Sequence, residues 1–135
     1  MSIKILIADD HEVVRCGLKS LLAGTDIKIV AEATTGEEAV RLAQKRPPDV
    51  VLIDIRMPGG DGLTALGRIK LDQPELPILI FSTYDNPTYV ARAVALGAAG
   101  YVLKGEPKDE LIEKIRVAAT GEGTWTRDEL RRVTG

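Results

Sequence analysis

Polar residues that could bind a metal ion or a phosphate group stand directly after four apolar runs of this sequence. In chain order these residues are Asp9 and Asp10, Asp54, Ser82, and Lys104. In an open α/β sheet the ligand site lies outside the carboxyl ends of the strands. If the runs are neighbouring parallel strands, we therefore expect these side chains to converge in one crevice.

Three carboxylates in one crevice require protons or a cation, because like charges a few ångströms apart repel by about 4 kcal/mol per pair near a protein surface. A shallow site with only oxygen ligands suits Mg²⁺ better than Ca²⁺. A bound cation holds the oxygens of an incoming phosphoryl group in line with a carboxylate nucleophile. Lys104 supplies a second positive charge for these oxygens, and Ser82 supplies a hydroxyl donor.

The pattern indicates a carboxylate that accepts a phosphoryl group as a covalent intermediate. Any one of these residues, taken alone, is more often a helix cap, a solvated loop residue or half of a surface ion pair. The inference rests on their occurrence together at four strand ends of one chain.

The site residues must be positioned by five short apolar runs, which are separated by stretches of helical periodicity. The runs lack polar alternation, which is typical of strands buried on both faces of a parallel sheet. They are Ile3–Ala8, Ile27–Ala31, Val50–Ile53, Ile78–Phe81 and Tyr101–Leu103. The alternation predicts an α/β fold, a doubly wound five-stranded parallel sheet with five helices.

Local signals predict where several helices begin and end. Helix starts are indicated by the Thr35…Glu38 capping box, by Asn86-Pro87 and, less cleanly, by Glu106-Pro107. Gly24, Gly97 and Gly121 stand where left-handed helix ends are needed.

Length and composition exclude several classes of protein. The 135 residues predict one domain, and the net charge of −2 argues against a broadly basic surface for nucleic acid. One cysteine, Cys16, and one histidine, His11, exclude a disulfide framework and a cysteine- or histidine-rich metal site. No apolar stretch is long enough for a membrane helix and no signal peptide is recognisable, so we expect no membrane association and a cytoplasmic location.

The sequence resembles the receiver domain of two-component response regulators from Ile3 to Thr120, nearly its whole length. The motifs that carry the resemblance are Asp9-Asp10-His11, the stretch from Asp54 to Gly62, Ser82-Thr83, and Gly97 to Lys104. The resemblance implies the flavodoxin-like receiver fold over residues 1–120. It also implies that the chain is not an enzyme beyond its own phosphorylation and dephosphorylation.

Roles for individual residues are implied by the same resemblance. Asp54 is the phosphorylated residue, and Mg²⁺ is bound by Asp9, Asp10, Asp54 and the backbone carbonyl of Arg56. Ser82 hydrogen-bonds the phosphoryl group, Lys104 forms a salt bridge to it, and Tyr101 is the aromatic side chain that turns inward when the switch hydroxyl moves. The sequence departs from the common pattern at Gly105, where many members carry a proline, and at Gly59-Gly60, which makes the loop after Pro58 more flexible.

The resemblance is strongest to receivers joined to a LuxR-type helix-turn-helix domain, which is absent from these residues. It implies a sensor histidine kinase as phosphodonor and DNA as the target of the missing domain, and it leaves homodimer formation open. Residues 121–135, with Trp125 and a charged helical piece over 128–133, are expected to be a linker that Trp125 packs back onto the domain.

Three other functions share some of these sequence features. An aspartyl phosphohydrolase needs a second acid two residues beyond its nucleophile, where this chain has Arg56. A nucleotide- or flavin-binding domain needs a glycine-rich cradle that the acidic segment 9–12 lacks. A free-standing receiver that acts only through protein contacts remains open.

Several other residues are expected to have ordinary structural or surface roles. His11 is expected to cap or pair locally, Cys16 to be a small buried side chain, and Tyr84 and Tyr89 to be interface or ordinary surface aromatics. The Arg131-Arg132 pair is too short to indicate a nucleic-acid patch.

Overall fold

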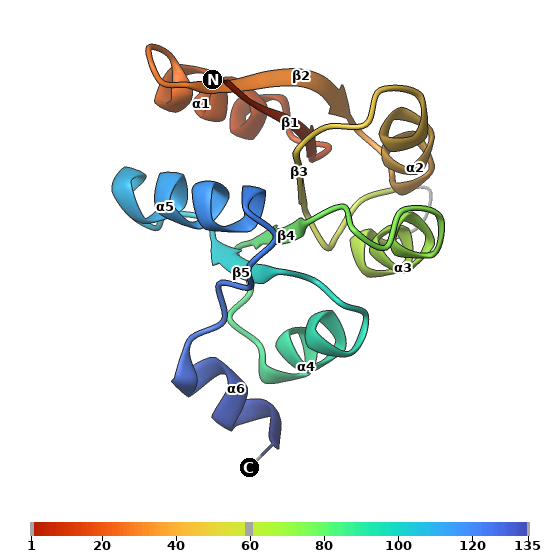
Figure 1. The fold of residues 1–135 in the computed structure, drawn as a ribbon, viewed down its shortest axis with the longest axis vertical. Coiled ribbons are helices and arrows are strands. Elements are labelled where there is room, and N and C mark those ends of the chain that lie inside the picture. The colour runs from red at the N-terminus through yellow and green to blue at the C-terminus, as the bar shows by residue number, and fades with distance from the viewer. Residues whose placement is uncertain (1, 59–60, 135) are drawn as a thin grey trace.

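Five parallel strands form one sheet in the computed structural model, which describes residues 2–58 and 61–134. The strand order is β2-β1-β3-β4-β5 (Figure 1). The strands are β1 (Ile3–Ala8), β2 (Ile27–Ala33), β3 (Val50–Ile53), β4 (Ile78–Ser82) and β5 (Gly100–Leu103). The predicted doubly wound sheet is confirmed, with β2, β4 and β5 slightly longer than expected.

Helices cover both faces of the sheet. Figure 1 shows α1 and α5 on one face and α2, α3 and α4 on the other. The helices are α1 (Glu12–Leu22), α2 (Gly36–Lys45), α3 (Gly62–Asp72), α4 (Pro87–Ala95), α5 (Lys108–Ala119) and α6 (Arg127–Thr134). The first five are those predicted, and α6 is the charged helical piece of the C-terminal segment. Among the described residues no helix has the length and apolar character of a membrane span.

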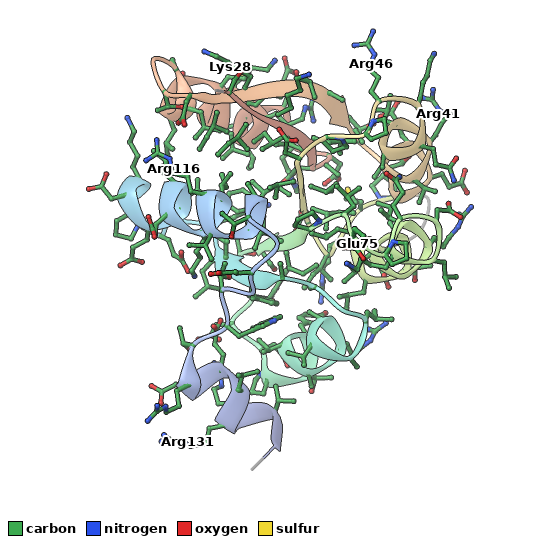
Figure 2. The ribbon with its side chains drawn as sticks, in the orientation of Figure 1. Lys28, Arg41, Arg46, Glu75, Arg116 and Arg131 are labelled. Atoms are coloured by element: carbon green, nitrogen blue, oxygen red, sulfur yellow. The ribbon has the colours of Figure 1, made fainter. Side chains whose placement is uncertain are left out.

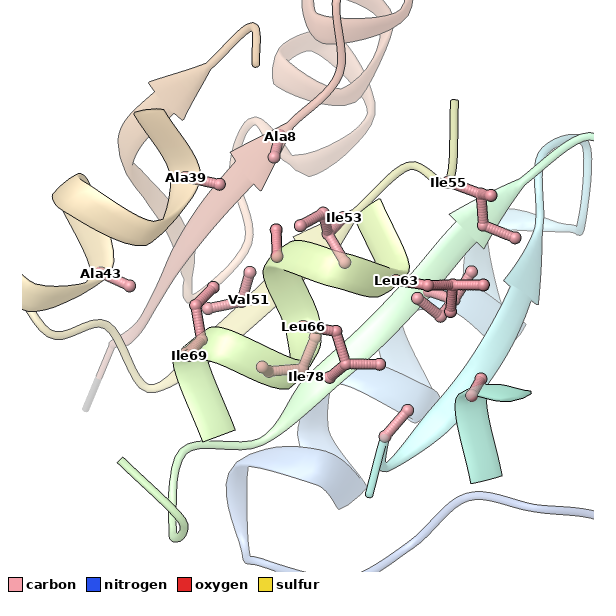
Figure 3. Close-up of a cluster of buried hydrophobic side chains, with 14 of the residues drawn as sticks. Ala8, Ala39, Ala43, Val51, Ile53, Ile55, Leu63, Leu66, Ile69 and Ile78 are labelled. Carbon is pink, nitrogen blue, oxygen red and sulfur yellow. The ribbon is translucent and has the colours of Figure 1, made fainter. Parts of the chain in front are cut away.

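Two hydrophobic cores lie on opposite faces of the sheet, because successive strand residues point to opposite sides. Val51 and Ile53 of β3 pack in the core beneath α2, α3 and α4, whereas Val50 and Leu52 pack in the core beneath α1 and α5. Figure 3 shows Ile53 in the first of these cores together with Leu66 of α3. Burial on both faces explains why the strands read as continuous apolar runs.

Two of the three predicted helix starts are confirmed. The Thr35 hydroxyl accepts a hydrogen bond from the Glu38 amide at 3.0 Å. Asn86 accepts one from the Thr88 amide at 2.8 Å, with Pro87 in the first turn of α4. The third prediction is wrong in detail: Pro107 itself occupies the cap position of α5. The Glu106 carboxylate instead pairs with Lys114 across 3.0 Å.

The glycine predictions hold at all three helix ends, where Gly24, Gly97 and Gly121 have φ of 81°, 89° and 91°. The prediction for Cys16 is wrong, because its side chain is exposed. Helix α1 turns Leu18 and Leu22 toward the core. A residue two positions before Leu18 lies about 200° around the helix from it and faces solvent.

Candidate functional site

The register of the central strands brings the predicted site residues to one edge of the sheet. Ala8 of β1 pairs with Ile53 of β3, so the next residues, Asp9 and Asp54, emerge side by side. The Asp54 amide donates to the Ala8 carbonyl oxygen at 2.9 Å. On the other side of β3, the Lys104 amide donates to the Ser82 carbonyl oxygen at 2.8 Å.

The acidic residues form a compact cluster. One potential ligand atom from each of Asp9, Asp10, His11 and Asp54 lies within 4.8 Å of the others. Asp9 and Asp54 are buried, with 1% and 4% of their surfaces exposed, whereas Asp10 is exposed. The convergence expected of the three carboxylates is therefore present in the structure.

Lys104 lies between the two buried carboxylates. Its Nζ is 2.6 Å from Asp9 Oδ2 and 3.2 Å from Asp54 Oδ2. Burial alone would lower the pKa of Lys104, but its interactions with the Asp9 and Asp54 carboxylates outweigh burial and raise the pKa above its usual value. The ammonium therefore stays charged and partly neutralises the cluster.

Burial has the opposite effect on the pKa of Asp54, one of the two acids that pair with Lys104. Burial is the largest influence on the Asp54 carboxyl and raises its pKa; Lys104 acts against this shift and Asp9 adds to it. The Ile55 amide also donates to Asp54 Oδ1 at 2.8 Å. One lysine and one amide do not fully compensate for the buried charge, so the ionised form of Asp54 is held at a cost to stability.

Asp54→Asn is therefore expected to stabilise the fold at neutral pH in the absence of divalent metal. The native pKa is raised, so the wild-type chain loses stability as pH rises from the usual aspartate pKa through the raised one. The asparagine chain does not titrate there, so its advantage is absent in acid, grows through that window and then levels off. Thermal unfolding in a chelating buffer between pH 4 and pH 8 measures the difference, and an advantage that shrinks with rising pH would contradict it.

An open pocket of roughly 780 Å³ lies over this cluster. It is lined by Asp10, His11, Val14, Asp54, Arg56, Met57, Pro58, Asp61, Thr83, Tyr84 and Lys104. Asp54 is buried yet reaches the pocket, whereas Asp9 lies behind it. The Gly59-Gly60 pair, expected to loosen this loop, lies outside the described residues.

The predicted switch residues, Ser82 and Tyr101, lie behind the pocket rather than in its wall. Ser82 is fully buried, and its hydroxyl accepts a hydrogen bond from the Tyr84 amide at 3.0 Å. Tyr101 is also buried and donates its phenolic hydrogen to the Tyr84 carbonyl oxygen. Burial raises the pKa of Tyr101, so the phenol keeps the proton that it donates.

Arg56 contributes a side-chain cluster that the sequence did not indicate. Its guanidinium lies 4.5 Å from the centre of the Tyr84 ring and donates to the Tyr89 hydroxyl at 3.3 Å. The two tyrosine rings meet edge to face with centroids 6.1 Å apart. The sequence predicts a role only for the Arg56 carbonyl and does not connect Arg56 with the two tyrosines, because nothing local links residues 28 or more positions apart.

Other pocket residues also went unpredicted. Thr83, Met57 and Pro58 line the pocket although the sequence predicts no individual role for them. Asp61 had a readable signal, an acid directly before a helix, and it caps α3 by accepting from the Thr64 amide at 2.8 Å. His11 pairs locally as expected, with Nδ1 3.0 Å from Asp9 Oδ1, but its side chain does not cap α1.

The donor set at the cluster fits a hard divalent cation. The buried Asp9 Oδ2 has an ion pair with Lys104 but no hydrogen bond among the described residues. Such an atom has a free lone pair for a metal ion or a water bound to one. Asp9, Asp10 and Asp54 could together supply the two or so carboxylates by which Mg²⁺ is usually held.

Comparison with known proteins agrees with the fold and the sequence motifs. The family model of the response regulator receiver domain matches residues 5–116. The chain is 36% identical over 121 residues to response regulator GacA of Pseudomonas aeruginosa, covering 89% of this chain and 56% of that protein. It is 40% identical over 120 residues to transcriptional regulatory protein DegU of Brevibacillus brevis, covering 88% and 51%.

Solved structures give the same result. A LuxR-family two-component response regulator from Aurantimonas sp. SI85-9A1 superposes with a TM-score of 0.89 at 30% identity, over 99% of this chain and 96% of that one. The chain spans about half the length of the two curated relatives described above. This chain therefore belongs to the response regulator receiver domain family.

Proposed function

We propose that Asp54 accepts a phosphoryl group in a Mg²⁺-dependent reaction, and that the domain then changes conformation to control an output. The observation that supports this choice of acceptor is that Asp54 alone among the clustered acids both lines the pocket and contacts Lys104. Asp9 contacts Lys104 but does not line the pocket, and Asp10 lines the pocket with no described contact to Lys104.

The reaction is a displacement at phosphorus. An Asp54 carboxylate oxygen forms a bond to the phosphorus of the donor while the bond from phosphorus to the leaving group breaks, which leaves an acyl phosphate on the chain. Mg²⁺ held by Asp9, Asp10, Asp54 and the Arg56 carbonyl would offset the charge of the phosphoryl oxygens. Lys104 already lies 3.2 Å from Asp54, so it can turn to a phosphoryl oxygen with little movement.

Ser82 and Tyr101 would convert this chemistry into a change of shape. A serine hydroxyl can donate one hydrogen bond while it accepts another. Ser82 can therefore donate to the phosphoryl group while it still accepts from the Tyr84 amide, an interaction 3.0 Å long. The Tyr101 hydroxyl donates a hydrogen bond to the carbonyl oxygen of the same residue, Tyr84. A phosphoryl group would thus stabilise the arrangement in which Tyr101 is buried.

In the full-length protein we place residues 1–120 as the phospho-acceptor domain and 121–135 as the start of a connection to a LuxR-type DNA-binding domain. The donor would be a sensor histidine kinase, and the output would be transcription regulation in the cytoplasm, where the DNA is. Support comes from DegU, a transcriptional regulatory protein of which the region aligned with this chain makes up 51%. Homodimer formation belongs to the same proposal, since RcsB, which superposes on this chain with a TM-score of 0.85 at 25% identity, has been solved as dimers bound to DNA.

The test is intact-mass spectrometry after incubation with acetyl phosphate. One phosphoryl group per chain is expected with Mg²⁺ and none with a chelator, and hydroxylamine should remove it because it cleaves acyl phosphates. A steady release of product from a generic phosphate ester would instead indicate a phosphohydrolase. Failure to gain mass from either acetyl phosphate or a phosphorylated sensor kinase would refute the proposal.

A further inference from the structure

The segment after α5 is attached to the backbone that leads into β5, the edge strand of the sheet. The Thr124 amide donates to the Ala99 carbonyl oxygen at 2.7 Å, and the Trp125 indole nitrogen donates to the Ala98 carbonyl oxygen at 3.0 Å. Ala98 and Ala99 directly precede β5. The segment therefore covers part of an edge that would otherwise expose unpaired backbone groups.

Helix α6 continues from this attachment and packs on α4 (Figure 1). A reciprocal capping box starts it: Thr126 accepts from the Glu129 amide at 3.0 Å, and Glu129 accepts from the Thr126 amide at 2.8 Å. Trp125 and Val133, at its two ends, both pack against the core that contains Val90 of α4. The helix is thus held by packing as well as by its polar contacts.

An ion pair joins α6 to the loop between β4 and α4. Arg132 Nη1 lies 2.8 Å from Asp85 Oδ1. Asp85 follows Tyr84, whose amide is bonded to the Ser82 hydroxyl and whose carbonyl is bonded to the Tyr101 phenol. The short loop from Thr83 to Asn86 therefore contacts α6 on one side and the proposed phosphoryl site on the other.

We infer that docking of α6 and phosphorylation of Asp54 favour each other through this loop. The inference rests on the proposed function. Asp85 pairs with Arg132, and the carbonyl of the adjacent Tyr84 accepts the hydrogen bond of the buried Tyr101. Docking of α6 therefore stabilises the arrangement of the loop in which Tyr101 is buried. A phosphoryl group that favours the same arrangement is bound more tightly when α6 is docked, and by thermodynamic reciprocity it strengthens docking equally.

The experiment measures binding of the phosphoryl mimic beryllofluoride, in the presence of Mg²⁺, to the full chain and to matched variants. Arg132→Ala is expected to weaken binding by about threefold, the effect of losing one partly exposed ion pair. Arg131→Ala is the control, because Arg131 pairs only with Asp128 of its own helix among the described contacts, and Figure 2 shows it on the side of α6 away from α4. Exchanging the charges, Asp85→Arg with Arg132→Asp, should restore most of the affinity.

The second measurement follows α6 itself in the parent chain. Beryllofluoride should slow amide hydrogen exchange in α6 by a similar factor and change the fluorescence of Trp125, the single tryptophan of the chain. Equal affinity in Arg132→Ala and the parent, or tighter binding in the variant, overturns the coupling while leaving the proposed function intact. Absence of beryllofluoride binding to the parent overturns the proposed function and the coupling together.

Discussion

Asp54→Asn is expected to abolish phosphoryl uptake from acetyl phosphate, whereas the parent chain gains one phosphoryl group. An amide is a far weaker nucleophile than a carboxylate, and among the described residues neither of the two clustered acids nearest to Asp54 is placed to replace it. Asp9 lies behind the pocket in its ion pair with Lys104, 2.6 Å away. Asp10 has no described contact to Lys104, which would have to stabilise the transferred group. Intact-mass spectrometry of the two proteins side by side measures the difference.

The matched control is Asp61→Asn. Asp61 lines the same pocket, and its hydrogen bond to the Thr64 amide, 2.8 Å long, can also be made by asparagine. This variant should take up phosphoryl groups as the parent does. Because Asp54→Asn is expected to be more stable than the parent, loss of uptake would not reflect unfolding. Equal mass gain in Asp54→Asn would refute the assignment of the acceptor.

Gly62→Ala should have the second large effect, on both stability and phosphoryl uptake. A Cβ at residue 62 would lie 1.8 Å from the carbonyl oxygen of Asp54. The Asp54 carbonyl belongs to the backbone, and the Cβ would be fixed to the backbone of residue 62, whose amide is bonded to the Ile55 carbonyl oxygen at 2.7 Å, so neither group can move away cheaply. We expect a loss of about 3 kcal/mol in the free energy of unfolding. A displacement of Asp54 by about 1 Å would slow uptake by about a hundredfold.

Gly17→Ala is the control for this prediction. Gly17 lies within α1, and a Cβ there would meet nothing within 4 Å. Replacing a glycine inside a helix by alanine should raise the free energy of unfolding by about 0.5 to 1 kcal/mol. Denaturant unfolding of both variants gives the stabilities, and the acetyl phosphate reaction gives the rates. If Gly62→Ala behaved like Gly17→Ala, the close approach of α3 to the Asp54 backbone would be refuted.

The strands and the main site residues were readable because their signals are local. A run such as Val50–Ile53 is apolar at every position because both faces of β3 are buried, and an acid directly after it must lie at the carboxyl edge. The convergence of Asp9, Asp54 and Lys104 then depended on one assumption, that the four strands followed by site residues, β1, β3, β4 and β5, lie next to one another in the sheet. The observed order β2-β1-β3-β4-β5 satisfies it.

Interpretations that depended on the environment of a side chain were less secure. Cys16 was expected to be buried from its residue type, but the rotation of α1 is set by Leu18 and Leu22. Pro107 was expected one position inside α5, but the residue before it, Glu106, pairs with Lys114 at 3.0 Å instead of capping the helix. In both cases a contact with another part of the chain outweighed the local preference.

The sequence by itself therefore determined the alternation of strands and helices, most of the caps, and the residue types available at the carboxyl edge of the sheet. Only the tertiary structure decided that Lys104 pairs with two acids, that Arg56 lies on Tyr84, and that Arg132 reaches Asp85. The physical reason is one of range. Strand burial and helix capping act within a few residues, whereas these contacts join segments 28 to 95 positions apart, which only the strand register and the crossover helices bring together.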